Sequence, residues 1–75
     1  MEDEIALREI DDTIGKHYSG TILARNRAIF WLHHRDGMTA QAIASIAWIE
    51  LNTKGVETVL RRMTHLIQSH IGTNH

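Results

Sequence analysis

Polar side chains that can bind phosphates and hydrogen-bond to the edges of bases are concentrated between residues 52 and 65. On a helix, residues three and four apart share a face, so most of them would lie on one exposed side. Arginine can donate two hydrogen bonds to guanine, lysine can bind guanine or a phosphate, and glutamate can accept from cytosine. Periodicity alone equally allows a solvated polar surface. The candidates are Asn52, Thr53, Lys54, Glu57, Thr58, Arg61, Arg62 and His65.

These candidates differ in the contacts they could make. Asn52 and Thr53 stand where a helix would begin, so their oxygens could cap free N–H groups beside a bound phosphate. Arg62, toward the side of the helix, and His65 suit the phosphate backbone better than the bases. Further cationic candidates, or else ordinary surface charges, are Arg25, Arg27 and Arg35.

The six histidines raise the question of a metal site. His33 and His34 are adjacent, and His65 and His70 are five residues apart, so no pair has the i, i+4 spacing with which a helix chelates zinc. The chain also lacks cysteine. Neither a nucleophilic triad nor a glycine-rich phosphate loop can be assembled. We therefore expect no metal, no cofactor and no enzyme activity.

Length and composition favour one small intracellular domain spanning residues 1–75. A chain of this size buries only about 60% of the surface that its unfolded form exposes, which leaves no room for a large internal active site. No apolar run approaches the roughly 20 residues of a membrane span, and the first four residues are acidic where a secretory signal would be basic. We expect a cytoplasmic protein without a membrane partner.

Charge is unevenly divided along the chain. Residues 1–12 hold six carboxylates against Arg8, a net charge of −5, whereas residues 13–75 hold seven Lys or Arg against three carboxylates, a net charge of +4. The acidic start suits the N-terminus of a solvated helix. The basic remainder is compatible with a polyanionic partner.

Apolar residues at helical spacing predict an all-α domain of four helices joined by short turns. We expect the first helix over residues 3–17 and the second from a Thr21 cap to residue 35 or 36, with Gly37 ending it at positive φ. The second helix is apolar on several sides. It is therefore either the central helix, covered by the others, or it leaves an exposed apolar patch for a partner protein. The candidates for such a patch are Phe30 and Trp31, and we expect Trp31 to be the more exposed.

The third and fourth helices are expected to meet at a corner. Thr39 can cap a short third helix with Ile43, Ala44, Ile46 and Ala47 inward and Gln41 and Ser45 outward. The fourth helix places its apolar residues within an arc of about 140°. In the join between them, Trp48, Ile49 or Leu51 packs against the core, or else Trp48 stays on the surface as a partner contact.

The segment from residue 25 to residue 67 resembles the promoter-reading C-terminal domain, region 4, of bacterial RNA polymerase sigma factors of the extracytoplasmic-function type. The matching landmarks are Arg27 with Ile29, Phe30 and Leu32, then Gly37-Met38-Thr39, Ile43-Ala44, and Val56-Glu57-Thr58 with Leu60 and Arg61. The resemblance implies a helix-turn-helix whose last helix reads the minus-35 promoter element. It also implies docking on the beta flap of RNA polymerase core, and capture by an anti-sigma factor is a further option.

Two departures from that family lie in the turn. Val56 lies twelve positions after Ala44, against about ten in helix-turn-helix proteins, and the usual glycine of the turn is missing. The angle at which the last helix would meet DNA is therefore open. So is the origin of the chain, which has no room for the minus-10 region of a sigma factor and would be either an excised domain or a free-standing regulator.

Two other functions fit the same pattern. One is the helix-turn-helix output domain of a response regulator, which dimerises through its last helix. The other is a protein-interaction bundle, for example one that binds an anti-sigma factor, with no DNA contact. The promoter sequence, the regulon, the activating signal and the oligomeric state cannot be deduced from these residues.

Overall fold

The helical spacing of apolar residues is realised along most of the chain. The computed structural model describes the backbone of residues 2–71 and the side chains of residues 7–69. Within these residues the chain forms four α-helices and one 3-10 turn, and no strand. The elements are α1 (Glu2–His17), α2 (Gly20–His34), α3 (Ala40–Ala44), η1 (Ala47–Ile49) and α4 (Thr53–Ile71). The all-helical prediction is confirmed.

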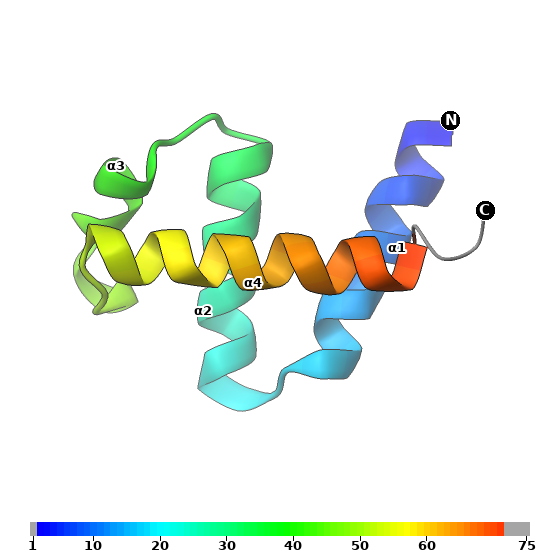
Figure 1. Ribbon diagram of the computed structural model, residues 1–75, viewed down its shortest axis with the longest axis horizontal. Helices are drawn as coiled ribbons and strands as arrows, with labels where there is room; N and C mark the ends of the chain where they lie inside the picture. The colour runs from blue at the N-terminus through cyan, green and yellow to red at the C-terminus, as the bar shows by residue number, and fades with distance from the viewer. Residues whose placement is uncertain (1, 72–75) are drawn as a thin grey trace.

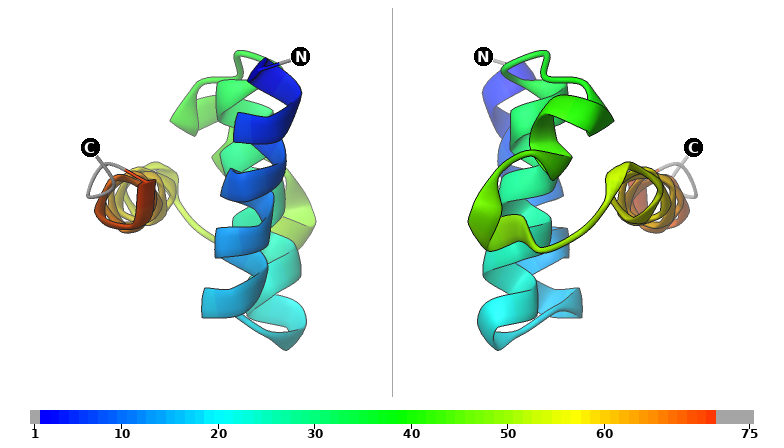
Figure 2. Two further views of the ribbon diagram at one scale, coloured as in Figure 1. Left: turned by 90° about the vertical axis from the view of Figure 1, so that its right-hand side faces the viewer. Right: turned by 90° about the vertical axis from the view of Figure 1, so that its left-hand side faces the viewer.

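Two layers make up the fold. Helices α1 and α2 run side by side in opposite directions, and α4 crosses one face of this pair (Figure 1). Figure 2 shows α4 end-on beside the α1–α2 layer. Helix α3 and η1 lie beside the start of α4 (Figure 1). Helix α2 packs against α1, α3 and α4, which explains its apolar residues on several sides, and α4 likewise packs against the three other helices.

Helix boundaries follow the local chemistry with one correction. Helix α2 begins at Gly20, and Ser19 rather than Thr21 occupies the cap position, because the Leu23 amide already bonds to the Ser19 carbonyl at 3.2 Å. At the other end, Gly37 has φ 71°, as predicted, and Met38 N–H bonds back to the Leu32 carbonyl. The Thr39 cap is confirmed, since its hydroxyl accepts from the Ala42 amide at 3.1 Å.

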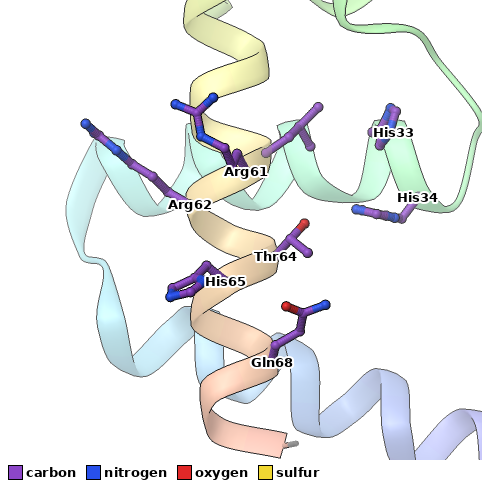
Figure 3. Close-up of a pocket in the computed structure, with 8 residues that line it drawn as sticks. His33, His34, Arg61, Arg62, Thr64, His65 and Gln68 are labelled. Atoms are coloured by element: carbon purple, nitrogen blue, oxygen red, sulfur yellow. The ribbon is translucent and has the colours of Figure 1, made fainter.

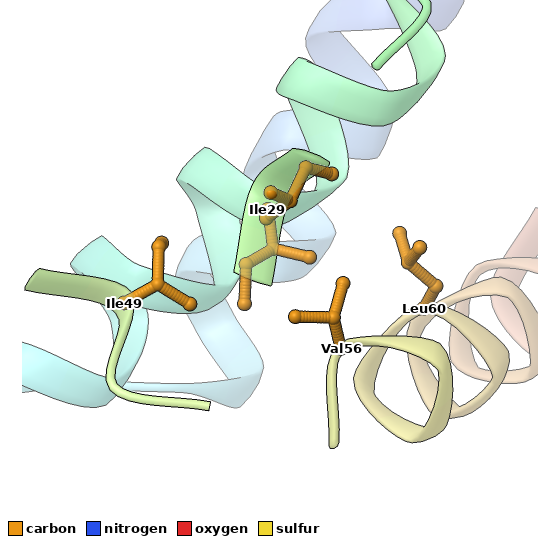
Figure 4. Close-up of a cluster of buried hydrophobic side chains, with 5 residues drawn as sticks. Ile29, Ile49, Val56 and Leu60 are labelled. Atoms are coloured by element: carbon orange, nitrogen blue, oxygen red, sulfur yellow. The ribbon is translucent and has the colours of Figure 1, made fainter. Parts of the chain in front are cut away.

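Two adjoining apolar clusters hold the layers together. The first joins α2, α3, η1 and α4 through Ile29, Ile43, Ile49, Val56 and Leu60 (Figure 4). The second joins α1 to α2 and α4 through Ile14, Phe30, Met63 and Ile67. Each cluster contains side chains that are fully or almost fully buried, so α4 is held on the bundle along most of its length.

A polar contact supplements the second cluster between α1 and α2. One carboxylate oxygen of Asp11 accepts a hydrogen bond from the Trp31 indole at 3.1 Å and lies 3.0 Å from Arg27 Nε. The Arg27 Nε–H is not aligned as a hydrogen bond, so that pair attracts mainly through charge. A Cβ at Gly15 would lie only 3.0 Å from the Arg27 guanidinium. The absence of a side chain there lets the arginine lie close to α1.

Candidate functional site

Helix α4 presents two chemically different faces. Val56, Leu60, Met63 and Ile67 are buried against the bundle. The opposite face exposes Lys54, Glu57, Arg61, Arg62 and His65, while Thr53 and Thr58 are half-buried. The predicted amphipathic arrangement is thus confirmed, and the polar candidates share one accessible side of the helix. Their role as a binding surface stays a prediction.

The start of α4 is organised by Asn52. Its side-chain oxygen accepts from the Gly55 amide at 2.8 Å, and its carbonyl accepts from the Val56 amide at 3.0 Å. A Cβ at Gly55 would lie 3.2 Å from that same side-chain oxygen and from a methyl group of Leu51, so the cap favours glycine at this position. Asn52 therefore acts first as the cap of α4. Thr53 is the first helical residue.

Thr58 has a more limited capacity than the pattern indicated. Its hydroxyl donates to the Lys54 carbonyl at 3.0 Å, within the helix. The hydroxyl oxygen keeps its lone pairs, so Thr58 can still accept a hydrogen bond. The exposed cationic donors of this face are consequently Lys54, Arg61 and Arg62.

These three cationic groups form no ion pair among the residues whose side chains are described, where the single ion pair is that of Arg27 with Asp11, although Glu57 lies on the same face of α4. The weaker arginine candidates are engaged elsewhere. Arg27 belongs to the α1–α2 contact, and the Arg35 guanidinium lies 4.9 Å from the centre of the Trp31 ring. Arg25 Nε donates to Asn26, a buried polar side chain.

A hollow of about 580 Å³ opens between the end of α2 and the middle of α4. Figure 3 shows Thr64 and Gln68 on the side of α4 nearer His34, and Arg62 and His65 on the other. The lining residues are His33, His34, Leu60, Arg61, Arg62, Thr64, His65 and Gln68. The sequence offered no sign of this site, since its two halves are about 30 residues apart and helical periodicity relates only residues within one helix.

The two neighbouring histidines of this hollow are held differently. His33 Nδ1 lies 2.8 Å from the Met38 carbonyl, so it donates to it and supports the turn after α2. The His34 ring packs against Phe30, with ring centres 4.4 Å apart. Burial of the ring, and secondarily the nearby His33, lower the pKa of His34 below its ordinary value of 6.5.

The partner-binding candidates on α2 offer little exposed apolar surface. Phe30 is buried in the second cluster, with 5% of its surface exposed. Trp31 is half-buried, and its indole N–H is bonded to Asp11. Neither therefore forms an exposed apolar patch, because α1 covers this side of α2.

Exposed apolar surface occurs instead beside the join. Trp48 and Ile22 are 55% and 51% exposed, and both line a hollow of about 480 Å³ that also includes Arg25 and Glu50. Ile49 is fully buried and Leu51 half-buried, so the join packs through these two residues and Trp48 lies on the surface. Ala47, predicted to face inward, is exposed because the short α3 ends at Ala44 and the chain turns before η1.

Among the residues that the structure describes, no three His, Asp or Glu side chains converge as a metal site would require. None of the helices within residues 2–71 is both long and apolar enough to cross a membrane. Searches against protein-family models, curated proteins and solved structures returned no match to this chain.

Proposed function

We propose that this chain is a sigma region 4-like DNA-binding module that reads a promoter element through α4. In this proposal α3, the join and α4 form a helix-turn-helix with a lengthened turn. The outer face of α4 lies in the major groove of the minus-35 element, where Lys54 and Arg61 contact bases and Arg62 and His65 contact the phosphate backbone.

One observation carries the proposal: α4 offers Lys54, Arg61 and Arg62 on an exposed face without a carboxylate partner among the described side chains. A cationic group already paired within its own chain would have to break that pair before binding a phosphate or a base. Unpaired exposed groups avoid this cost, and they are fixed to a helix whose other face is buried.

The lengthened turn is compatible with this role because it is ordered by packing. Ile49 is fully buried in the first cluster, and Glu50 follows it with φ 57°, a left-handed conformation. This reversal brings the chain to Asn52, which caps α4. The buried isoleucine and the cap take the place of the glycine that such turns usually contain.

The number of cationic groups limits how tightly the module can bind alone. With about four phosphates neutralised, the logarithm of the binding constant should fall with the logarithm of the salt concentration with a slope near −3.6. Raising salt from about 50 to about 200 mM would then weaken binding roughly 150-fold. Docking on the beta flap of RNA polymerase core would compensate by raising the local concentration of the module at its element.

The proposal is tested by selection of duplexes from a random pool by the purified chain at low salt, followed by affinity measurement on the enriched sequence. We expect one short motif to be enriched. Replacing both Lys54 and Arg61 by alanine should lower the affinity for that motif by at least about 30-fold, since each base contact contributes about 1–3 kcal/mol.

Lys16→Ala is the matched control, because it removes an exposed cation from the end of α1. It should leave the affinity for the motif within about two-fold of that of the unsubstituted chain, because it changes only the general attraction to the DNA phosphates. Thermal unfolding of each variant verifies that folding is intact. Equal losses in the control and in the double variant, or no enriched motif, would contradict the proposal.

A protein-interaction bundle remains the second candidate because of exposed Trp48 and Ile22. Motif enrichment separates the two functions, and Trp48→Ala shows whether the exposed apolar surface takes part in DNA binding. If DNA reading by α4 is the activity, this variant should keep its affinity for the selected motif. If the chain acts only through protein contacts, no motif will be enriched in the first place.

A further inference from the structure

The hollow between α2 and α4 is rich in nitrogen-bearing side chains. Its lining includes two arginines and three histidines, and no carboxylate. This is unusual in a chain with a net charge of −1. Arg61 and Arg62 are permanently charged, and each histidine can add a positive charge on protonation. The electrostatic character of the site therefore favours an anion.

The remaining lining residues indicate what else the ligand carries. Leu60 is almost buried and provides an apolar surface. The His34 ring, which packs against Phe30, lines the same hollow. Thr64 and Gln68 add neutral hydrogen-bonding groups on the side of α4 nearer His34 (Figure 3). A volume of about 580 Å³ lies within the range of small-molecule sites, about 300–1,000 Å³.

We propose that this hollow binds a small organic phosphate that carries a flat ring, such as a nucleoside monophosphate. The ring covers Leu60, and the phosphate lies by Arg61 and the histidines of α2, while Arg62 adds positive charge from the side of α4 away from His34 (Figure 3). Inorganic phosphate would satisfy only the cationic part of the site, and an uncharged nucleoside only the apolar part. A ligand with both should bind more tightly than either alone.

The histidines give this site a proton-linked signature. His33 Nδ1 donates to the Met38 carbonyl, so only its other ring nitrogen, Nε2, is available to a ligand. Partial burial disfavours the charged form of His34. Its neighbours in the hollow are His33, from its own helix, and Arg61, Arg62 and His65, from α4. A bound phosphate would favour the charged imidazoles, so binding takes up protons and tightens as the pH falls.

Resting on the proposed function, the same site would regulate DNA reading. Arg61 lines the hollow and also belongs to the exposed face of α4. One guanidinium cannot serve a bound phosphate and a guanine together. The ligand and the duplex are therefore expected to compete.

The test is to titrate the purified chain with adenosine 5′-monophosphate, inorganic phosphate and adenosine in turn. Binding is monitored through the NMR signals of the histidine rings. We expect the monophosphate to saturate with a Kd of about 1 mM or tighter, and the other two probes to bind at least about five-fold more weakly. Saturable binding should strengthen between pH 7.5 and 6. An effect of the monophosphate no greater than that of chloride at equal ionic strength would overturn the proposal.

His34→Gln is the decisive variant, because His34 is exposed and no hydrogen bond of its ring contributes to the turn after α2. It should weaken binding of the monophosphate about five-fold, as expected for one solvent-accessible charged contact. His17→Gln is the matched control, since it removes an exposed histidine at the end of α1. Equal weakening by both variants would overturn the site assignment.

Two crossed measurements separate this site from the DNA-reading face. Lys54 does not line the hollow, so Lys54→Ala should lose duplex affinity and keep the monophosphate. His34→Gln should do the reverse. If His34→Gln weakens duplex binding while the monophosphate fails to saturate, the hollow binds the phosphate backbone of DNA and the free-ligand proposal is wrong. If no duplex is bound but the monophosphate saturates, only the proposed function fails.

Discussion

At the scale of single residues, His34 links the fold to pH. Its pKa is lowered mainly by burial, so the folded chain holds fewer protons than the unfolded chain between pH 6.5 and the lowered value. Stability should therefore fall as the pH drops through that window and level off below it. Denaturant midpoints at pH 7.5, 6.5 and 5.5 measure this slope.

The slope should become shallower in His34→Gln, because glutamine has no proton to bind in this range. His17→Gln serves again as the control for removing a histidine as such. An unchanged slope in His34→Gln would mean that other groups determine the pH dependence of folding.

At the scale of elements, the join between α3 and α4 decides how α4 is presented. Ile49 and Trp48 are neighbours in η1, yet the first is fully buried and the second 55% exposed. Ile49→Ala should lower the free energy of unfolding by about 2–5 kcal/mol, because it leaves a cavity in the first cluster. Trp48→Ala should change it by no more than about 0.5 kcal/mol.

Chemical denaturation of both variants checks this contrast with one method. Comparable losses for the two substitutions would show that Trp48 also packs in solution, as the sequence had allowed. A loss confined to Ile49→Ala would confirm that Ile49, and not Trp48, packs the join against the core.

The join also marks where prediction from sequence stops. The four helices and the buried side of α4 were predictable because residues in one helix are related by a fixed 100° step. Between residues 45 and 52 no such rule holds. There, packing between residues far apart in the sequence decides that Ile49 is buried and Trp48 is not. Glu50 has a left-handed conformation, which a sequence usually reveals by a glycine, and here no glycine marks it.

The candidate site divides in the same way. The exposed polar face of α4 was predictable from periodicity within that helix. The hollow was not, because it forms only when the end of α2 reaches the middle of α4. Nor was the burial of Phe30 predictable, since α2 is apolar on several sides and only the placement of α1 decides which of them is covered.

At the scale of the whole molecule, α1 is attached more lightly than the other long helices. Among its described side chains only Ile14 is buried, and Asp11 supplies the polar contact to α2. Both members of the Asp11–Arg27 pair are about 40% exposed, so the pair should contribute no more than about 1 kcal/mol. Asp11→Asn should therefore speed amide hydrogen exchange in α1 by up to about five-fold, with little effect on the first half of α4.

Asp12→Asn is the matched comparison for that measurement. It removes the same charge from the next position of α1, where the side chain is exposed. Exchange that rises equally in both variants would mean that net charge, rather than the contact with α2, controls the opening of α1.

The crossing of α1 and α4 has an electrical consequence. Helix α1 carries six carboxylates against Arg8 and Lys16 and lies toward one end of α4 (Figure 1), whereas residues 18–75 carry six Lys or Arg against three carboxylates. Charge of opposite sign is thus separated along a molecule 37 Å long. Such a body has a permanent dipole moment, and near any polyanion it rotates until its acidic end points away. Productive orientation then begins during diffusion, before the surfaces touch.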